Sequence, residues 1–130
     1  KDYLNAHWNR ALLREKLGDK VGAIADYDRV LALKEDHTLA LRSRGLLRQG
    51  TGDLRGALTD YDRLIALSPL DPDPYGLRSF TRFRLKDLGG AIADVQKALK
   101  LAPQDWSQRQ VMEEVLKLAQ DELKKSQPEK

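Results

Sequence analysis

The chain has 130 residues, of which 33% are charged and 6% aromatic, with no cysteine and a formal net charge of +3 at pH 7. This length suits one domain, residues 1–130, that folds without metal or disulfide support, and the lack of cysteine excludes disulfides and thiolate metal sites. The small net charge speaks against a nucleic-acid partner, and no apolar run is long enough to cross a membrane.

No signal-peptide pattern opens the chain, which favours a cytoplasmic location. A periplasmic or exported location is the alternative if a signal was removed, so the sequence leaves the compartment unknown. Because the first residue is Lys1 rather than methionine, we expect a fragment of a longer protein.

The sequence repeats with a period of 34 residues. Residues 4–37, 38–71 and 72–105 align without a gap. Seven columns are identical in all three blocks: Arg10/Arg44/Arg78, Arg14/Arg48/Arg82, Asp19/Asp53/Asp87, Gly22/Gly56/Gly90, Ala23/Ala57/Ala91, Asp26/Asp60/Asp94 and Leu33/Leu67/Leu101. Such a register indicates tandem copies of one structural unit.

The first block is expected to form a helix, a tight turn and a second helix. The first helix begins near Leu4 and ends at Gly18, a residue that tolerates the left-handed conformation found after helices. Asp19 then caps the second helix, which runs to Leu33.

The second and third blocks repeat this plan with differences. Gly52 and Asp53 reproduce the turn, whereas Lys86 replaces the glycine of the third block, so that turn is expected to be the least relaxed. Asp71 and Pro72 supply a cap and a first helical residue for the third block.

Residues 106–124 are predicted to form a last helix, capped by Asp105, and residues 125–130 a frayed tail. Its apolar residues recur at helical spacing: Met112, Val115, Leu116, Ala119 and Leu123. A stack of repeats exposes the apolar face of its last member, so we expect a C-terminal capping helix. The alternative is a free helix that binds a partner.

Small residues are expected where the two helices of a block approach each other closely. These positions are Ala11, Gly45 and Ser79 on the first helices and Ala23, Ala57 and Ala91 on the second.

The repeated arginines are predicted to pair with aspartates of the same block. Arg10 and Arg14 are four residues apart and therefore share a helical face. In an antiparallel hairpin with its turn near residues 17–19, Arg10 lies level with Asp26, and the other two blocks follow the same geometry. The alternative, a basic stripe for an acidic partner, is opposed by these aspartates.

Residues 4–105 resemble three tetratricopeptide repeats. The resemblance rests on the small residue at 11/45/79, Gly-Asp at 18–19 and 52–53, Ala at 23/57/91, Tyr at 27/61 and Pro at 69/103, and the RG…GD…GAL…DYD pattern of the second block is similar to bacterial members. It implies an all-α, right-handed superhelical solenoid of three helix-turn-helix repeats with a C-terminal capping helix. His7 and Leu41 stand where the family often has Trp, and Glu35 replaces the first terminal Pro.

The resemblance also implies a function. First helices of the family line a concave groove that accepts an extended peptide or a helix, which makes the chain a protein–protein interaction scaffold or adaptor. We call the residues that correspond to this groove the predicted binding surface: Trp8, Leu12, Lys16, Leu39, Arg42, Leu46, Gln49, Phe80, Phe83 and Arg84.

Four other interpretations stay open. One is RNA binding by a basic face, which predicts a steep salt dependence of binding to polyanions. The side chains of the predicted binding surface could finish the inner packing of the repeats. The chain could instead be a self-assembly module that forms homo-oligomers through its N-terminal face, or an accessory regulatory domain of a longer protein.

Some family members grip acidic C-terminal tails through a clamp of Lys and Asn. Here Trp8 and Leu12 occupy its first places and Asp73 and Leu77 its last, so we expect a more apolar ligand. No catalytic motif appears and the two histidines lack a third metal ligand, so we expect no enzyme, cofactor, metal or small-molecule substrate. His37 is expected in an exposed turn between repeats.

Overall fold

The computed structural model describes residues 3–128, and every regular element within them is an α-helix. Contacts between backbones group the chain into two units, Lys1–Leu67 and Ser68–Lys130. The single domain expected from the sequence stays a prediction.

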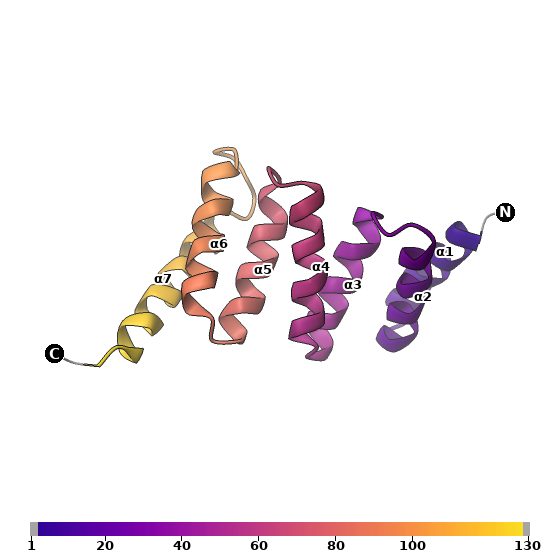
Figure 1. Cartoon of the computed structure of the whole chain (residues 1–130), viewed down its shortest axis with the longest axis horizontal. Helices are drawn as coiled ribbons and strands as arrows, with labels where there is room; N and C mark the ends of the chain where they lie inside the picture. Colours follow the sequence, from indigo (N-terminus) through magenta and orange to yellow (C-terminus); the bar gives the residue numbers. More distant parts are fainter. Residues whose placement is uncertain (1–2, 129–130) are drawn as a thin grey trace. The chain divides into compact units, whose positions relative to one another are not determined.

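The first unit consists of two helical hairpins. Its helices are α1 (Tyr3–Lys16), α2 (Lys20–Leu33), α3 (Thr38–Thr51) and α4 (Leu54–Leu67). Each packs against the next along the chain, and Figure 1 shows α1 and α2 as one pair and α3 and α4 as the other. The predicted division of each repeat into helix, turn and second helix is therefore confirmed here.

The second unit consists of the third hairpin and one further helix. Helices α5 (Pro72–Arg84) and α6 (Leu88–Leu101) form the hairpin, and α7 (Arg109–Ser126) packs mainly against α6 and also against α5 (Figure 1). Val95 of α6 forms a buried cluster with Met112 and Val115 of α7. The last helix thus covers an apolar face, as predicted for a capping helix.

The start of α7 differs from the prediction. The helix begins at Arg109 rather than at residue 106, and Asp105 does not cap it, since Gln108 occupies the N-cap without a side-chain hydrogen bond. The reason lies in Trp106, whose Nε1 donates to Asp73 Oδ1 over 2.9 Å. This bond ties residue 106 to the start of α5, and the chain makes two short turns before the helix can begin.

The end of α7 also differs from the prediction. The helix continues to Ser126, two residues into the segment expected to fray. Residues 129–130 of the predicted tail lie outside the described residues.

The turns inside the repeats follow the predicted chemistry. The side chains of Asp19, Asp53 and Asp87 each accept a hydrogen bond from the backbone N–H three residues later, at 2.9–3.0 Å. Gly18 and Gly52 precede two of these caps with φ of 79° and 92°. At the third turn, Lys86 adopts φ of 66°, which confirms that this turn lacks the relaxed glycine.

Close packing explains the small residue at the centre of each first helix. Ala11 and Ser79 are fully buried, and Gly45 is buried as well. A Cβ on Gly45 would lie 2.6 Å from Cε1 of Tyr61, so this glycine lets α4 approach α3.

Candidate functional site

The repeated arginines and aspartates meet between the two helices of each repeat. In the second repeat, Arg44 Nη2 lies 2.7 Å from Asp60 Oδ1, and Arg48 Nη1 lies 3.2 Å from Asp60 Oδ2. The Asp60 side chain is 1% exposed, so its charge is compensated inside the hairpin.

The other two repeats contain the same network. Asp26 accepts from Arg10 and Arg14, and Asp94 accepts from Arg78 and Arg82, with distances of 2.7–3.1 Å. The predicted pairing is confirmed. These arginines therefore hold hairpins together, and the one buried aspartate of each repeat compensates part of the charge of its two arginines.

Charge and burial shift the pKa values of two neighbouring groups. Hydrogen bonds from Arg10 lower the pKa of Asp26; burial opposes this shift, while Arg29 and the charge of Arg14 add to it. Burial raises the pKa of the Tyr27 phenol to about 12, and its bond to the Glu15 carboxylate adds to the rise.

Part of the predicted binding surface is open to solvent. Leu12 and Leu46 are each 37% exposed, Leu39 is 59% exposed, and Lys16 and Arg42 are exposed beside them on α1 and α3. Arg84, at the end of α5, is exposed as well. These residues are accessible to a ligand.

Trp8, Gln49 and Phe80 of the predicted binding surface also take part in internal contacts. Trp8 is half-buried, with ring centroids 5.5 Å from Tyr27 and 4.9 Å from His37. Gln49 Oε1 accepts from the Tyr61 hydroxyl at 2.9 Å.

The two phenylalanines on α5 are both half-buried. Phe80 packs against the cluster of Val95, Met112 and Val115, while Phe83 lies one turn further along the helix. Phe80, like Trp8 and Gln49, therefore contributes to its own unit whether or not it also meets a ligand.

Two members of the predicted binding surface line one pocket in the first unit. Arg42 and Leu46 of α3 face Glu15 of α1 and Lys20 of α2 around a cavity of about 330 Å³. Its lining combines two leucines, Leu46 and Leu47, with charges of both signs.

His37 has a role that the sequence analysis missed. It is half-buried rather than exposed, and its Nδ1 accepts from the Ala40 backbone N–H at 3.1 Å, which caps α3. Its position directly before a helix was the signal that could have revealed this cap.

The described part of the chain has neither a cluster of metal ligands nor a membrane-spanning helix. Within residues 3–128, no cluster of three His, Cys, Asp or Glu side chains is arranged to hold a metal ion. No helix in that range combines the length and the apolar character needed to span a bilayer.

The hairpins, their aspartate caps and the covering helix define an all-α solenoid of helix-turn-helix repeats. Tetratricopeptide repeat family models match residues 4–37 and residues 42–105. The chain belongs to the tetratricopeptide repeat family.

Solved structures share this fold at low sequence identity. MamA superposes with a TM-score of 0.85 at 19% identity, over 94% of this chain and 64% of that one, so the chain is shorter than this relative. The first repeat domain of Spaghetti (RPAP3), bound to the HSP90 peptide SRMEEVD, gives 0.80 at 19% identity over 92% of both chains.

A third relative is the type III secretion chaperone SycD of Yersinia enterocolitica in complex with a peptide of the translocator YopD. It gives a TM-score of 0.84 at 14% identity, over 95% of this chain and 96% of that one. No curated protein sequence matches the chain at a significant level.

Proposed function

We propose that the chain is an adaptor that binds a protein segment along the first helices of its repeats. The observation that carries this proposal is the exposure of Leu12, Leu39 and Leu46 on α1 and α3. Leucines are the side chains that folding normally buries, and a group of them at the surface is typical of an interaction site.

The chemistry of these helices favours one kind of ligand. Lys16 and Arg42 flank the exposed leucines, so the ligand is an amphipathic helix or an apolar peptide with acidic flanks. Trp8 is a further proposed contact in the first unit, and Phe80, Phe83 and Arg84 of α5 are the proposed contacts in the second unit.

The solved relatives support peptide binding as the general activity. Spaghetti and SycD carry bound peptides in structures with this fold. The HSP90 peptide SRMEEVD has three acidic side chains. Since Trp8, Leu12, Asp73 and Leu77 occupy the places of the polar clamp, the proposed ligand of this chain is more apolar.

A double substitution tests the proposal. Leu12→Asp with Leu46→Asp places two charges in the proposed interface, whereas Leu33→Asp alters a leucine that is 57% exposed at the end of α2. Proteins captured by the immobilised chain should bind the double variant more weakly by about tenfold or more, equivalent to ~1.4 kcal/mol. The Leu33→Asp variant should retain them.

Equal capture by all three proteins would refute binding through the first helices. Circular dichroism establishes that the double variant is folded, so that a loss of capture reports on the surface. The expected change concerns exposed residues and should leave the helical signal intact.

Self-association is the second candidate function. Leu13, Leu17 and Val21 are 56%, 75% and 80% exposed at the turn between α1 and α2. Leu47, the residue of the second repeat that corresponds to Leu13, is half-buried and lies in α3, which packs against α2. Burying this apolar patch against a second copy would stabilise a dimer.

Sedimentation over a concentration series separates the two candidates. Self-association predicts a mass that rises with concentration and a monomer after Leu17→Lys with Val21→Lys. A constant monomer mass for the unmodified chain would exclude it.

A further inference from the structure

A second cavity lies in the first unit, between the second helices of two repeats. It is lined by residues of α2, the turn after α2, α3 and α4, and it is an open cavity of about 400 Å³. The lining residues are Asp28, Leu31, Ala32, Glu35, Leu41, Arg44, Thr59, Asp60 and Arg63. Apart from Arg44 and Asp60, these residues are not explained by the hairpin networks or by the predicted binding surface.

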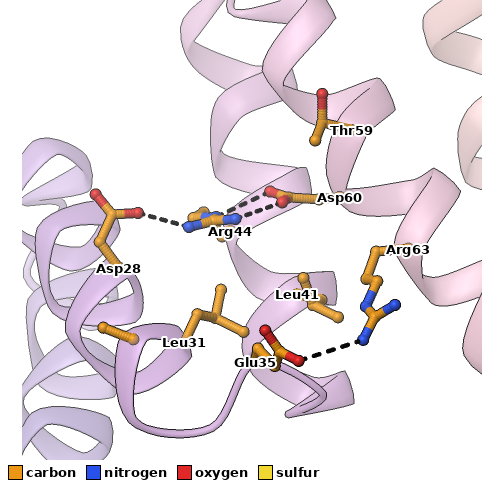
Figure 2. Close-up of a pocket in the computed structure, with 9 residues that line it drawn as sticks. Asp28, Leu31, Glu35, Leu41, Arg44, Thr59, Asp60 and Arg63 are labelled. Carbon is orange, nitrogen blue, oxygen red and sulfur yellow. Dashed lines mark hydrogen bonds and ion pairs between the residues drawn. The ribbon is translucent and has the colours of Figure 1, made fainter.

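Charged groups border the cavity on two sides. Figure 2 shows Arg44 between Asp28 and Asp60, with Nη1 2.8 Å from Asp28 Oδ1 and Nη2 2.7 Å from Asp60 Oδ1. A second pair, Arg63 Nη2 and Glu35 Oε1 at 4.0 Å, lies on the other side.

Two leucines lie between these charged groups. Figure 2 shows Leu31 and Leu41 between the ion pairs of Arg44 and the Glu35–Arg63 pair. Leu31 is 8% exposed and Leu41 3% exposed, so they form an apolar base at the bottom of a charged rim.

Two residues that line this cavity depart from the repeat pattern. The residues that correspond to Leu41 and Glu35 one repeat later are Tyr75 and Pro69. There the Tyr75 ring is 8% exposed and its hydroxyl donates to the Pro69 carbonyl oxygen at 2.9 Å. Leu41 is smaller than tyrosine and has no hydroxyl, and Glu35 places a carboxylate among the lining residues of the cavity.

Both departures from the repeat pattern therefore line one cavity. We propose that this cavity is a second docking site, which takes an aromatic side chain of a partner protein next to a lysine or arginine of the same segment. The ring occupies the space above Leu31 and Leu41, and the cation meets Asp28 and Glu35.

The charges of the lining favour a cation over an anion. Three carboxylates, of Asp28, Glu35 and Asp60, stand against two guanidinium groups. The side chains of Asp28 and Glu35 are 50% and 88% exposed, so each carboxylate has room to accept from a ligand.

The guanidinium group of Arg44 has its hydrogen-bond donors occupied and is poorly placed to bind an anion. Nε, Nη1 and Nη2 of Arg44 all donate to Asp28 or Asp60 at 2.7–3.1 Å. An acidic or phosphorylated segment would have to break these bonds and would meet the carboxylates of the rim. An aromatic ring beside a cation requires no such rearrangement.

Titration with short blocked peptides tests the site. The probe is N-acetylated and C-amidated Lys-Trp-Lys, with Lys-Ala-Lys as the control for the ring and Glu-Trp-Glu as the control for charge. Two-dimensional ¹H–¹⁵N spectra of the full chain should show saturable shifts at the amides of Leu31, Ala32, Leu41 and Thr59. Both control peptides should bind more weakly by about tenfold or more.

Variants of the chain separate this site from the predicted binding surface. Leu41→Tyr restores the residue of the third repeat and should abolish saturable binding of Lys-Trp-Lys. Ala32→Leu narrows the cavity from its rim and serves the same purpose if Leu41→Tyr does not fold. The double variant of Leu12 and Leu46 should bind the probe as the unmodified chain does, so failure of either proposal is recognisable.

Three results would overturn the inference. They are the absence of saturable shifts, shifts that map outside the cavity, and binding that is unaffected by both Leu41→Tyr and Ala32→Leu. Equal affinity for Glu-Trp-Glu and Lys-Trp-Lys would refute the assignment of a cationic neighbour.

Discussion

Neutralising Asp60 should destabilise the protein strongly. Its carboxylate is 1% exposed and accepts from Arg44 at 2.7 and 3.1 Å and from Arg48 at 3.2 Å. In Asp60→Asn one acceptor oxygen remains, while the new NH₂ group faces guanidinium donors. Two cations then lie beside a neutral group.

The size of the loss in stability depends on how well water can solvate the two arginines once Asp60 is neutral. Breaking a buried ion pair from one side costs about 3–5 kcal/mol, and exposure reduces this figure. Arg44 and Arg48 are 16% and 22% exposed, and Arg44 keeps its bond to Asp28. We therefore expect a loss of about 3 kcal/mol in the free energy of unfolding.

The first repeat provides an internal comparison. Asp26 is as deeply buried, but its partners Arg10 and Arg29 are 47% and 49% exposed. Water reaches these guanidinium groups more easily after the aspartate is neutralised. Asp26→Asn should therefore cost less than Asp60→Asn, although the chemical change is the same.

Urea unfolding followed by circular dichroism measures these differences. Asp36→Asn, in the exposed turn after α2, is the control and should change the free energy of unfolding by less than about 0.5 kcal/mol. The slopes of the transitions show whether the repeats still unfold together. A loss for Asp60→Asn no larger than that of the control, or a larger loss for Asp26→Asn, would refute the reasoning.

Three further predictions concern the turns, the helix contact and pH. Lys86→Gly should raise the free energy of unfolding by about 0.5–1 kcal/mol because Lys86 holds φ of 66°, whereas Gly52→Ala at φ of 92° should lower it; urea unfolding checks both. Gly45→Ala should lower the free energy of unfolding by about 1–3 kcal/mol, and with it the melting temperature, because the new Cβ would lie 2.6 Å from the Tyr61 ring. An unchanged melting temperature would contradict this contact. Burial raises the pKa of Tyr27 above the ordinary 10.0 to about 12, so the folded state binds this proton more tightly than the unfolded state. The resulting stability is present below pH 10 and is lost as the pH rises towards 12, which near-ultraviolet tyrosinate absorbance and circular dichroism should show together.

Acid should act in the opposite sense through Asp26. Its pKa is lowered in the folded state, so the unfolded chain binds this proton more readily. The stabilisation is present above the ordinary pKa of 3.8 and is lost as the pH falls through the lowered value. Between neutral and acidic pH, the Asp26→Asn variant should therefore lose less of its free energy of unfolding than the unmodified chain does.

The sequence alone predicted the elements whose causes are local. Asp19, Asp53 and Asp87 cap helices because a carboxylate satisfies free N–H groups within one turn. Lys86 was recognised as the strained turn because the register aligned it with two glycines. The Arg–Asp networks were also predictable, since a hairpin with a known turn places residues sixteen apart side by side.

Other features depended on contacts between distant residues. Trp106 delays the start of α7 through its bond to Asp73, thirty-three residues earlier. Phe80 was predicted as a ligand contact, but α7 also packs against it. No helical periodicity within a single segment contains this information.

The cavity between α2 and α4 likewise depends on contacts that the sequence alone does not predict. In the sequence, Leu41 and Glu35 were two unrelated departures from a repeat pattern. Only the packing of α2 and α4 over α3 shows that they line one space. Periodicity and capping determine which residues form helices, because backbone hydrogen bonds link near neighbours; the space between helices depends on side-chain volumes that come from separate segments.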